Sequence, residues 1–284
     1  MDASEIDEAA TPSAPSTDRP TPAVAAIVVT HDPGDWLEEV LEGLAAQDYD
    51  ELSVLVVDAG SRTDLTDRVA ATHPHAFVRH LDENPGFAAA ANAGAEMVDG
   101  AAMLLFCHDD VVLEPDALRQ MVDETYRSNC AVVGPKQVRW SAPRELLSVG
   151  MSADKLGYPV ERIERGEFDQ GQHDTARDVF YLAGGCVLVR ADLFTEIGGF
   201  DEGIHVHGED LDLCWRAHLA GARVMVAPTA RVRHLEGLGH RREVDDRRRL
   251  QARHRLRTVL SVYTPFSLLR ILPQAYTTSA MPSR

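Results

Sequence analysis

The fold is decided by residues 24–61, which read VAAIVVTHDPGDWLEEVLEGLAAQDYDELSVLVVDAGS. Two short apolar runs, Val24–Val29 and Ser53–Val57, each stop at polar turn-forming residues. Continuous apolar runs of this length are typical of strands that are buried on both faces of a sheet. Between the two runs, the apolar residues of Trp36–Leu44 recur at helical spacing. The segment therefore predicts a strand, a helix and a second strand in succession.

The same alternation continues through the first half of the chain. We expect further strands at Phe77–Leu81 and Met103–Cys107, and a helix in the alanine-rich segment Gly86–Val98. Asp35 with Glu38 has the spacing of a capping box, which predicts that the first helix begins there. Strands that alternate with helices predict an α/β domain with a mostly parallel sheet flanked by helices.

The second half of the chain has a less regular pattern. Residues 136–178 mix charges, Gly and Pro, which suggests long loops and edge strands. Residues 183–190 then predict a strand, 191–200 a short helix and 207–221 an amphipathic helix that stops at a glycine. A last strand is expected over residues 223–228, where it would end at a proline.

The composition excludes several classes of protein. The chain has 284 residues and a formal net charge of -17, so it lacks the surplus of Lys and Arg that nucleic-acid binding requires. Its four cysteines have no CxxC spacing, which argues against a zinc cluster and suits a reducing cytoplasm. Residues 1–22 lack the apolar segment of a signal peptide and have the composition of a disordered leader. We therefore expect a cytoplasmic protein with no nucleic-acid partner.

Polar residues follow the predicted strands at the points where those strands end. Ligands gather at the carboxyl ends of parallel strands, and Thr30–Asp32, Asp58 and Asp109–Asp110 fall there. Two adjacent carboxylates repel each other unless a cation lies between them, and a divalent cation there could also bridge a diphosphate. A solvated acidic turn is the simpler alternative, but the position at the sheet edge favours a metal site. Asp58 could contact a base or ribose, or could cap its own turn.

Two further places in the sequence have candidate chemistry. Acidic residues open the helix at Gly208–Asp212, where they stabilise the helix dipole, and Asp210 is also placed to accept a proton from a hydroxyl group. His234 follows the last expected strand and could complete a carboxylate metal site, although a lone histidine is more often structural. No GxGxxG follows the first strand, which disfavours a dinucleotide-dependent oxidoreductase.

Four segments in consecutive order resemble one known family. They are residues 24–61, the Asn84–Ala88 segment, the acidic His108–Asp110 segment, and residues 183–234, which contain Glu209-Asp210 and end at a histidine. Together they make the chain similar to family 2 inverting glycosyltransferases of the GT-A fold, which is Rossmann-like, and to their rhamnosyl- and galactofuranosyl-transferase-like branch. The resemblance implies a GT-A domain at residues 23–236.

The resemblance implies a donor site for a nucleoside diphosphate-sugar, UDP- or dTDP-linked. Thr30 and Asp58 would contact the nucleotide, Asp82 and Asn84 would complete its pocket, and Asp109 would assist at the diphosphate. His31 stands where the family often has an aromatic residue followed by Asn, and His108 stands where many members have Asp or Asn.

The resemblance also implies the catalytic groups. Asp110 would hold Mn²⁺ or Mg²⁺ against the diphosphate, with His234 as a further ligand. Asp210 would deprotonate the acceptor hydroxyl, and Glu209 would orient the substrate. The implied reaction is transfer with inversion at the anomeric carbon, in the synthesis of an envelope polysaccharide or glycolipid. A catalytically impaired nucleotide-sugar-binding or scaffold protein of the same fold is the alternative.

Residues 237–284 form a basic, helical extension to the predicted domain. Its segment 252–276 is first basic and then apolar, which suits a helix on an anionic membrane surface, such as the inner face of the plasma membrane, where lipid-linked acceptors reside. A terminal helix packed on the domain explains the pattern equally well.

Overall fold

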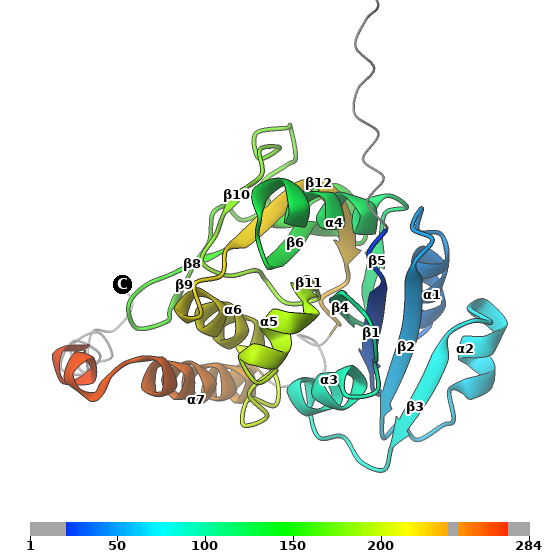
Figure 1. Cartoon of the computed structure of the whole chain (residues 1–284), viewed down its shortest axis with the longest axis horizontal. Coiled ribbons are helices and arrows are strands. Elements are labelled where there is room, and N and C mark those ends of the chain that lie inside the picture. The colour runs from blue at the N-terminus through cyan, green and yellow to red at the C-terminus, as the bar shows by residue number, and fades with distance from the viewer. Residues whose placement is uncertain (1–20, 238–243, 272–284) are drawn as a thin grey trace, which may run out of the picture.

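The computed structural model describes residues 21–237 and 244–271. The strands of its main sheet are β1 (Val24–Thr30), β2 (Leu52–Ala59), β3 (Phe77–Leu81), β4 (Met103–His108), β5 (Val111–Leu113), β6 (Val132–Arg139), β7 (Ala142–Ser148), β10 (Arg177–Asp178), β11 (Cys186–Arg190) and β12 (Val224–His234). Within the described residues they form a ten-stranded sheet in the order β10-β12-β6-β11-β4-β1-β2-β3, in which β5 joins β12 and β7 joins β6 (Figure 1). A separate pair consists of β8 (Ser152–Ala153) and β9 (Pro159–Val160).

Helices cover both faces of the sheet. They are α1 (Leu37–Ala45), α2 (Thr66–Thr72), α3 (Phe87–Ala95), α4 (Ala117–Ser128), α5 (Ala191–Glu196), α6 (Glu209–Leu219) and α7 (Val244–Val262). Successive side chains of a strand point to opposite faces, so Val24, Ala26 and Val28 of β1 pack with α1, α2 and α4, whereas Ala25 and Ile27 pack with α3, α5 and α6. The prediction of a mostly parallel α/β sheet flanked by helices is confirmed.

The register of the parallel strands aligns their carboxyl ends. In the pairing of β1 with β2, Thr30 lies opposite Asp58, and in the pairing of β1 with β4, Val29 lies opposite His108. Three predicted strand ends therefore meet at one edge of the sheet, as expected.

The prediction of loops and edge strands from residue 136 onward is wrong at its start. Residues 136–139 belong to β6, which lies inside the sheet between β12 and β11. Lys136 is fully buried there, and its ammonium group is paired with Asp169 at 3.1 Å and with Asp174. A buried charge needs such partners, which the local sequence does not reveal.

The predicted capping box at Asp35 and Glu38 is also wrong. Helix α1 begins at Leu37, and its N-terminus has no side-chain capping bond. Glu38 is bound by the guanidinium group of Arg68 from α2, with Nη2 donating to Oε2 at 2.6 Å. The Glu38 carboxylate is thus engaged by Arg68 and does not cap the helix.

The last strand continues past the proline at which it was expected to end. A register shift between Ala227 and Arg231 accommodates Pro228, which has no N–H to donate to the ladder. His234 is therefore the last residue of β12, and it lies opposite Val111 of β5. This pairing brings His234 beside Asp110 and creates the centre of the candidate site.

Helix α7 packs on α6 at the outside of the molecule (Figure 1). Thr258 and Val259 are buried, and the ring of Tyr263 meets that of Trp215 edge to face at 5.5 Å. The packing alternative for the C-terminal segment is thus observed through residue 263. No helix within 21–237 and 244–271 has both the length and the apolar character needed to cross a bilayer. Residues 1–20 of the predicted leader and 272–276 of the amphipathic segment lie outside the described residues.

Candidate active site

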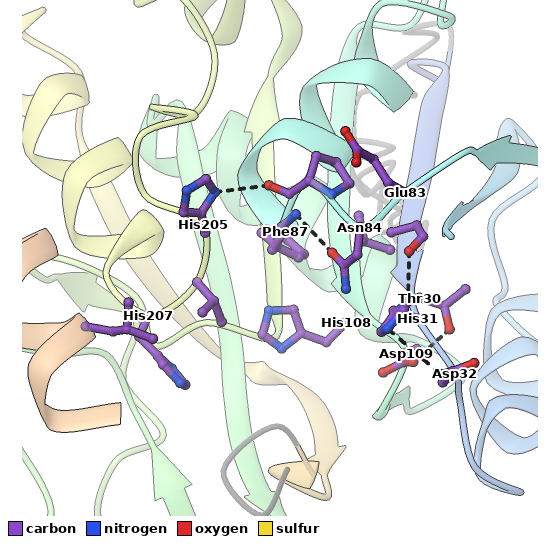
Figure 2. A pocket seen from close by; sticks show the side chains of 16 residues that line it. Thr30, His31, Asp32, Glu83, Asn84, Phe87, His108, Asp109, His205 and His207 are labelled. Atoms are coloured by element: carbon purple, nitrogen blue, oxygen red, sulfur yellow. Dashed lines mark hydrogen bonds and ion pairs between the residues drawn. The ribbon is translucent and has the colours of Figure 1, made fainter. Parts of the chain in front are cut away.

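A pocket of about 800 Å³ opens at the carboxyl edge of the sheet. Its walls come from Thr30–Asp32 at the end of β1, from residues 83–87 at the start of α3, from residues 108–109 at the end of β4, from residues 205–207 before α6, and from Leu250 of α7. Figure 2 shows the histidines of the α6 loop on one side, the β1 residues on the other, and Phe87 with His108 between them. Elements far apart in the sequence therefore converge on one cavity.

A compact cluster of possible metal ligands borders this pocket. Its members are His108, Asp110 and His234, whose candidate ligand atoms all lie within 4.8 Å of one another. Oδ1 of Asp110 is 3.3 Å from Nε2 of His234 and 3.9 Å from Nδ1 of His108. The Asp110 side chain is 1% exposed and each imidazole is 11% exposed.

The ligand atoms of this cluster that lack a well-aligned hydrogen bond fit a divalent metal ion. Among the described residues, Oδ1 of Asp110 and Nδ1 of His108 are buried without a well-aligned hydrogen bond. The other Asp110 oxygen accepts the Gly237 amide at 2.7 Å, and Nδ1 of His234 contacts Oε1 of Gln137 at 3.0 Å. Such outer contacts orient ligating groups in metal sites. Two imidazole nitrogens with one carboxylate oxygen suit Mn²⁺ and later transition metals better than Mg²⁺.

The protonation states of the cluster also fit metal binding. Burial lowers the pKa of His108 to about 4, although the Asp110 carboxylate acts in the opposite direction. Burial would raise the pKa of Asp110, but the hydrogen bond and charge of His234, the charge of His108 and the Gly237 amide together lower it to about 2. At neutral pH the cluster thus presents an ionised carboxylate beside a neutral His108, which are the forms that bind metals.

Three of the five predicted donor-site residues line the pocket. They are Thr30, Asn84 and Asp109. The Thr30 hydroxyl donates to Oδ2 of the buried Asp109 at 2.7 Å, and Oδ1 of Asn84 accepts the Gly86 amide at 2.9 Å. These contacts fix the side chains at the edge of the pocket.

The other two predicted donor-site residues lie outside the pocket lining. Asp58 is buried, and its two oxygens face the Ser61 amide and Nδ1 of His80, each at 3.0 Å. This is the turn-capping arrangement that the sequence left as an alternative. Asp82 is exposed after β3.

The structure brings the predicted base close to the metal cluster. Asp210 lies in the first turn of α6, where Oδ1 accepts the Leu211 amide at 2.7 Å and Oδ2 accepts the Gly184 amide at 2.9 Å. A Cβ atom at Gly184 would lie 3.6 Å from Oδ2 of Asp210 and 3.7 Å from Cε1 of His108. Gly184 therefore lies next to both the Asp210 carboxylate and the His108 ring of the cluster.

The neighbouring Glu209 is in a different protonation state. Its side chain is buried, and burial together with the charge of Asp210 raises its pKa to about 8. Burial also raises the pKa of Asp210, while the amides of Leu211 and Gly184 oppose the shift. At pH 7 we therefore assign the negative charge of this pair to Asp210 and the proton to Glu209.

The sequence interpretation missed three histidines of the site. The sequence places His108 in the acidic segment as a departure from the family pattern and does not predict it as a metal ligand, whereas it is a member of the cluster. His205 and His207 have no motif in the sequence that marks them as site residues, yet both line the pocket (Figure 2). The spacing of His108 and Asp110 at a strand end indicates that both could bind the same metal ion. No comparable pattern marks the two loop histidines.

Comparison with known proteins gives a consistent result. The "N-acetylglucosaminyl-diphospho-decaprenol L-rhamnosyltransferase" of Mycobacterium tuberculosis is 28% identical over 247 residues, which cover 75% of this chain and 76% of that protein. The "O-antigen biosynthesis protein RfbC" of Myxococcus xanthus is 28% identical over 230 residues, which cover 78% of this chain but only 18% of that longer protein.

The solved structures show the same fold. A crystal structure of GalNAc-T7 with UDP, GalNAc and Mn²⁺ superimposes with a TM-score of 0.63 at 14% identity, over 75% of this chain and 43% of that one. The likeness supports the GT-A fold. In addition, residues 21–256 match the family model for "Glycosyltransferase like family 2", which covers well over half of the chain. The protein therefore belongs to glycosyltransferase family 2.

Proposed function

We propose that the protein transfers a sugar from a nucleoside diphosphate-sugar to an acceptor hydroxyl in a metal-dependent reaction that inverts the anomeric carbon. The observation that carries the proposal is the buried His108–Asp110–His234 cluster, which borders the pocket through His108 and has Asp210 nearby across Gly184. Neither Lys nor Arg occurs among the described residues that line the pocket. A diphosphate would therefore need another cation there, and the cluster can hold one.

Each polar group of the site has a place in this reaction. A divalent ion held by the cluster would stabilise the charge that develops on the departing nucleoside diphosphate. Thr30, Asn84 and Asp109 hold the nucleotide at the pocket edge. Asp210 accepts the proton of the acceptor hydroxyl. Glu209, which keeps its proton, leaves Asp210 as the ionised carboxyl of the pair and orients the acceptor.

Asp58 and Asp82 belong to the outer, base-binding part of the proposed donor site. Asp58 directly precedes Ala59, which lines the pocket, and Asp82 directly precedes the lining residue Glu83. The donor is a UDP- or dTDP-linked hexose. The similarity to a protein named as an L-rhamnosyltransferase favours a rhamnosyl-type donor and a glycan or lipid-linked acceptor in envelope synthesis.

The alternative of an impaired binding or scaffold protein depends on His108, which stands where many family members have an acidic residue or Asn. His108 now occupies the position of the absent acid with a side chain that can itself bind a metal ion. The observed geometry thus favours the enzyme.

The metal requirement is tested by calorimetry with UDP and dTDP. We expect at least one nucleotide to bind roughly tenfold or more tightly with Mn²⁺ than with EDTA, and more tightly with Mn²⁺ than with Mg²⁺. The His108→Asp variant, with an oxygen ligand in place of nitrogen, is expected to reduce the preference for Mn²⁺. Nucleotide-sugar hydrolysis or transfer should have the same metal dependence. Equally tight binding of both nucleotides in EDTA would contradict the proposed metal site.

We further infer that the outer face of α7 contacts the anionic inner face of the plasma membrane. Arg249, Arg253, Leu256 and Leu260 recur at helical spacing and are exposed, and the two leucines are 49% and 47% exposed. Beyond α7, Phe266 and Leu269 are also exposed. A basic and apolar face on an otherwise acidic chain matches the charge of such a surface.

Vesicle flotation tests the membrane contact. The protein should float with vesicles that contain phosphatidylglycerol and much less with pure phosphatidylcholine, because the arginines require anionic lipid. A Leu256→Ser, Leu260→Ser double variant should lose most of the binding without a change in nucleotide affinity. Equal flotation with both lipid compositions, or an unaffected double variant, would exclude this face.

A further inference from the structure

The loop of residues 201–208 is the last part of the connection from α5 to α6 and ends directly at the Glu209–Asp210 pair. On its pocket side the loop is tied to the start of α3. The Phe87 amide donates to the His205 carbonyl at 2.8 Å, and Nδ1 of His205 lies 3.1 Å from the Pro85 carbonyl. The loop thus forms one wall of the pocket and determines where α6 begins.

Helix α7 holds the opposite side of the same loop. His254 is completely buried, and its Nδ1 lies 2.8 Å from the Val206 carbonyl and 3.1 Å from the His207 carbonyl. A carbonyl can only accept, so Nδ1 of His254 has the hydrogen and donates it to this pair. One turn further along, Arg257 donates to both carboxylate oxygens of Asp201 at 2.6 and 2.8 Å. The loop is therefore fixed at both ends from α7.

The backbone between these contacts has an unfavourable conformation. His207 has a φ of +64°, which is uncommon for a residue other than glycine, and Gly208 follows with a φ of +117°. Residues held in such conformations persist only where the surrounding structure determines them. The buried donor at the carbonyls of residues 206 and 207 supplies this constraint immediately before the catalytic pair.

We propose that His254 is a positioning residue of the active site, which fixes the loop backbone at Val206 and His207 so that Asp210 faces the metal cluster. The proposal rests on the proposed glycosyl transfer. One turn before His254, Leu250 lines the pocket itself, so α7 contributes both a wall and a support. The helix is accordingly part of the catalytic domain.

The test compares two substitutions that differ in hydrogen bonding. His254→Asn places an amide N–H where Nδ1 stands, whereas His254→Leu fills the space without a donor. We expect His254→Leu to lower kcat by about 10- to 100-fold, because small displacements of a catalytic group have effects of this size. Its Kd for the Mn²⁺-dependent nucleotide should stay within about twofold. His254→Asn should retain kcat within about fivefold of wild type.

Hydrogen exchange provides a readout that does not depend on turnover. The amides of residues 201–208 should exchange faster in His254→Leu and at the wild-type rate in His254→Asn, with Gln251→Ala on the exposed face of α7 as the matched control. Wild-type protein that transfers no sugar would refute the proposed function, while exchange would still decide the positioning. Three results would overturn the positioning role. The first is wild-type exchange and kcat in His254→Leu, and the second is exchange and kcat in His254→Asn that are no closer to wild type than those of His254→Leu. The third is a nucleotide affinity that falls as much as kcat.

Discussion

The Asp210→Asn variant is expected to lose about a thousandfold in kcat for sugar transfer, within the range that general bases contribute, while its Mn²⁺-dependent nucleotide affinity stays near that of wild type. Asn keeps the size of the side chain and one carbonyl oxygen that can accept the Gly184 or Leu211 amide. It cannot accept the proton of a hydroxyl group. Steady-state kinetics and calorimetry on the same preparation measure the two quantities.

The matched control is Glu209→Gln. Because the raised pKa keeps Glu209 protonated at pH 7, the neutral amide reproduces its charge, and we expect kcat within about tenfold of wild type. Undiminished turnover in Asp210→Asn would refute the base assignment. A loss in Glu209→Gln as large as that in Asp210→Asn would move the base to Glu209.

The protonation of Glu209 can be checked independently through stability. Its pKa of about 8 in the folded protein lies above the ordinary value of 4.5, so folding favours the protonated form. The stability contributed by this group is complete below pH 4.5 and is lost as the pH rises toward 8. Urea unfolding from pH 5 to 8 should therefore show Glu209→Gln gaining stability relative to wild type as the pH rises.

The sequence predicts the parallel half of the fold well because the local pattern there has one interpretation. The segments Val24–Val29 and Val54–Val57 are apolar at every position and are followed by polar turns, as buried parallel strands are. Strand β6 has the same burial but contains Gly134, Pro135 and Lys136. Its charge is neutralised by residues more than 30 positions away, so local composition alone suggests a loop.

The sequence predicts a site residue only where the role of that residue follows from the segment in which it lies. Asp110 stands at a strand end, which the sequence shows directly. The membership of His108 and His234 in one cluster depends on the pairing of β12 with β5, and this pairing requires the strand to continue past Pro228. His254 is a single histidine on a helix, and only the carbonyls that it contacts distinguish it from a core residue.

The Asp110→Asn variant is expected to weaken nucleotide binding in the presence of Mn²⁺ by roughly 100-fold or more. The substitution removes the one carboxylate of the cluster, whose pKa of about 2 shows that the surrounding groups stabilise its charge. The remaining ligands would be two imidazoles, which leave the charge of a bound cation uncompensated in a buried site. Calorimetry measures the loss of nucleotide binding, and electron paramagnetic resonance of free Mn²⁺ measures the loss of Mn²⁺ binding.

The exposed Asp99→Asn is the matched control for this substitution, with the same chemical change in a surface loop and no expected effect on either measurement. Retained Mn²⁺ binding in Asp110→Asn would place the metal elsewhere, whatever the turnover. Combined with Asp210→Asn, the result also separates the two halves of the mechanism. A metal ligand should affect both nucleotide affinity and kcat, because the donor diphosphate and its departure depend on the same cation. A base should affect kcat alone, since it acts on the acceptor hydroxyl after the donor has bound.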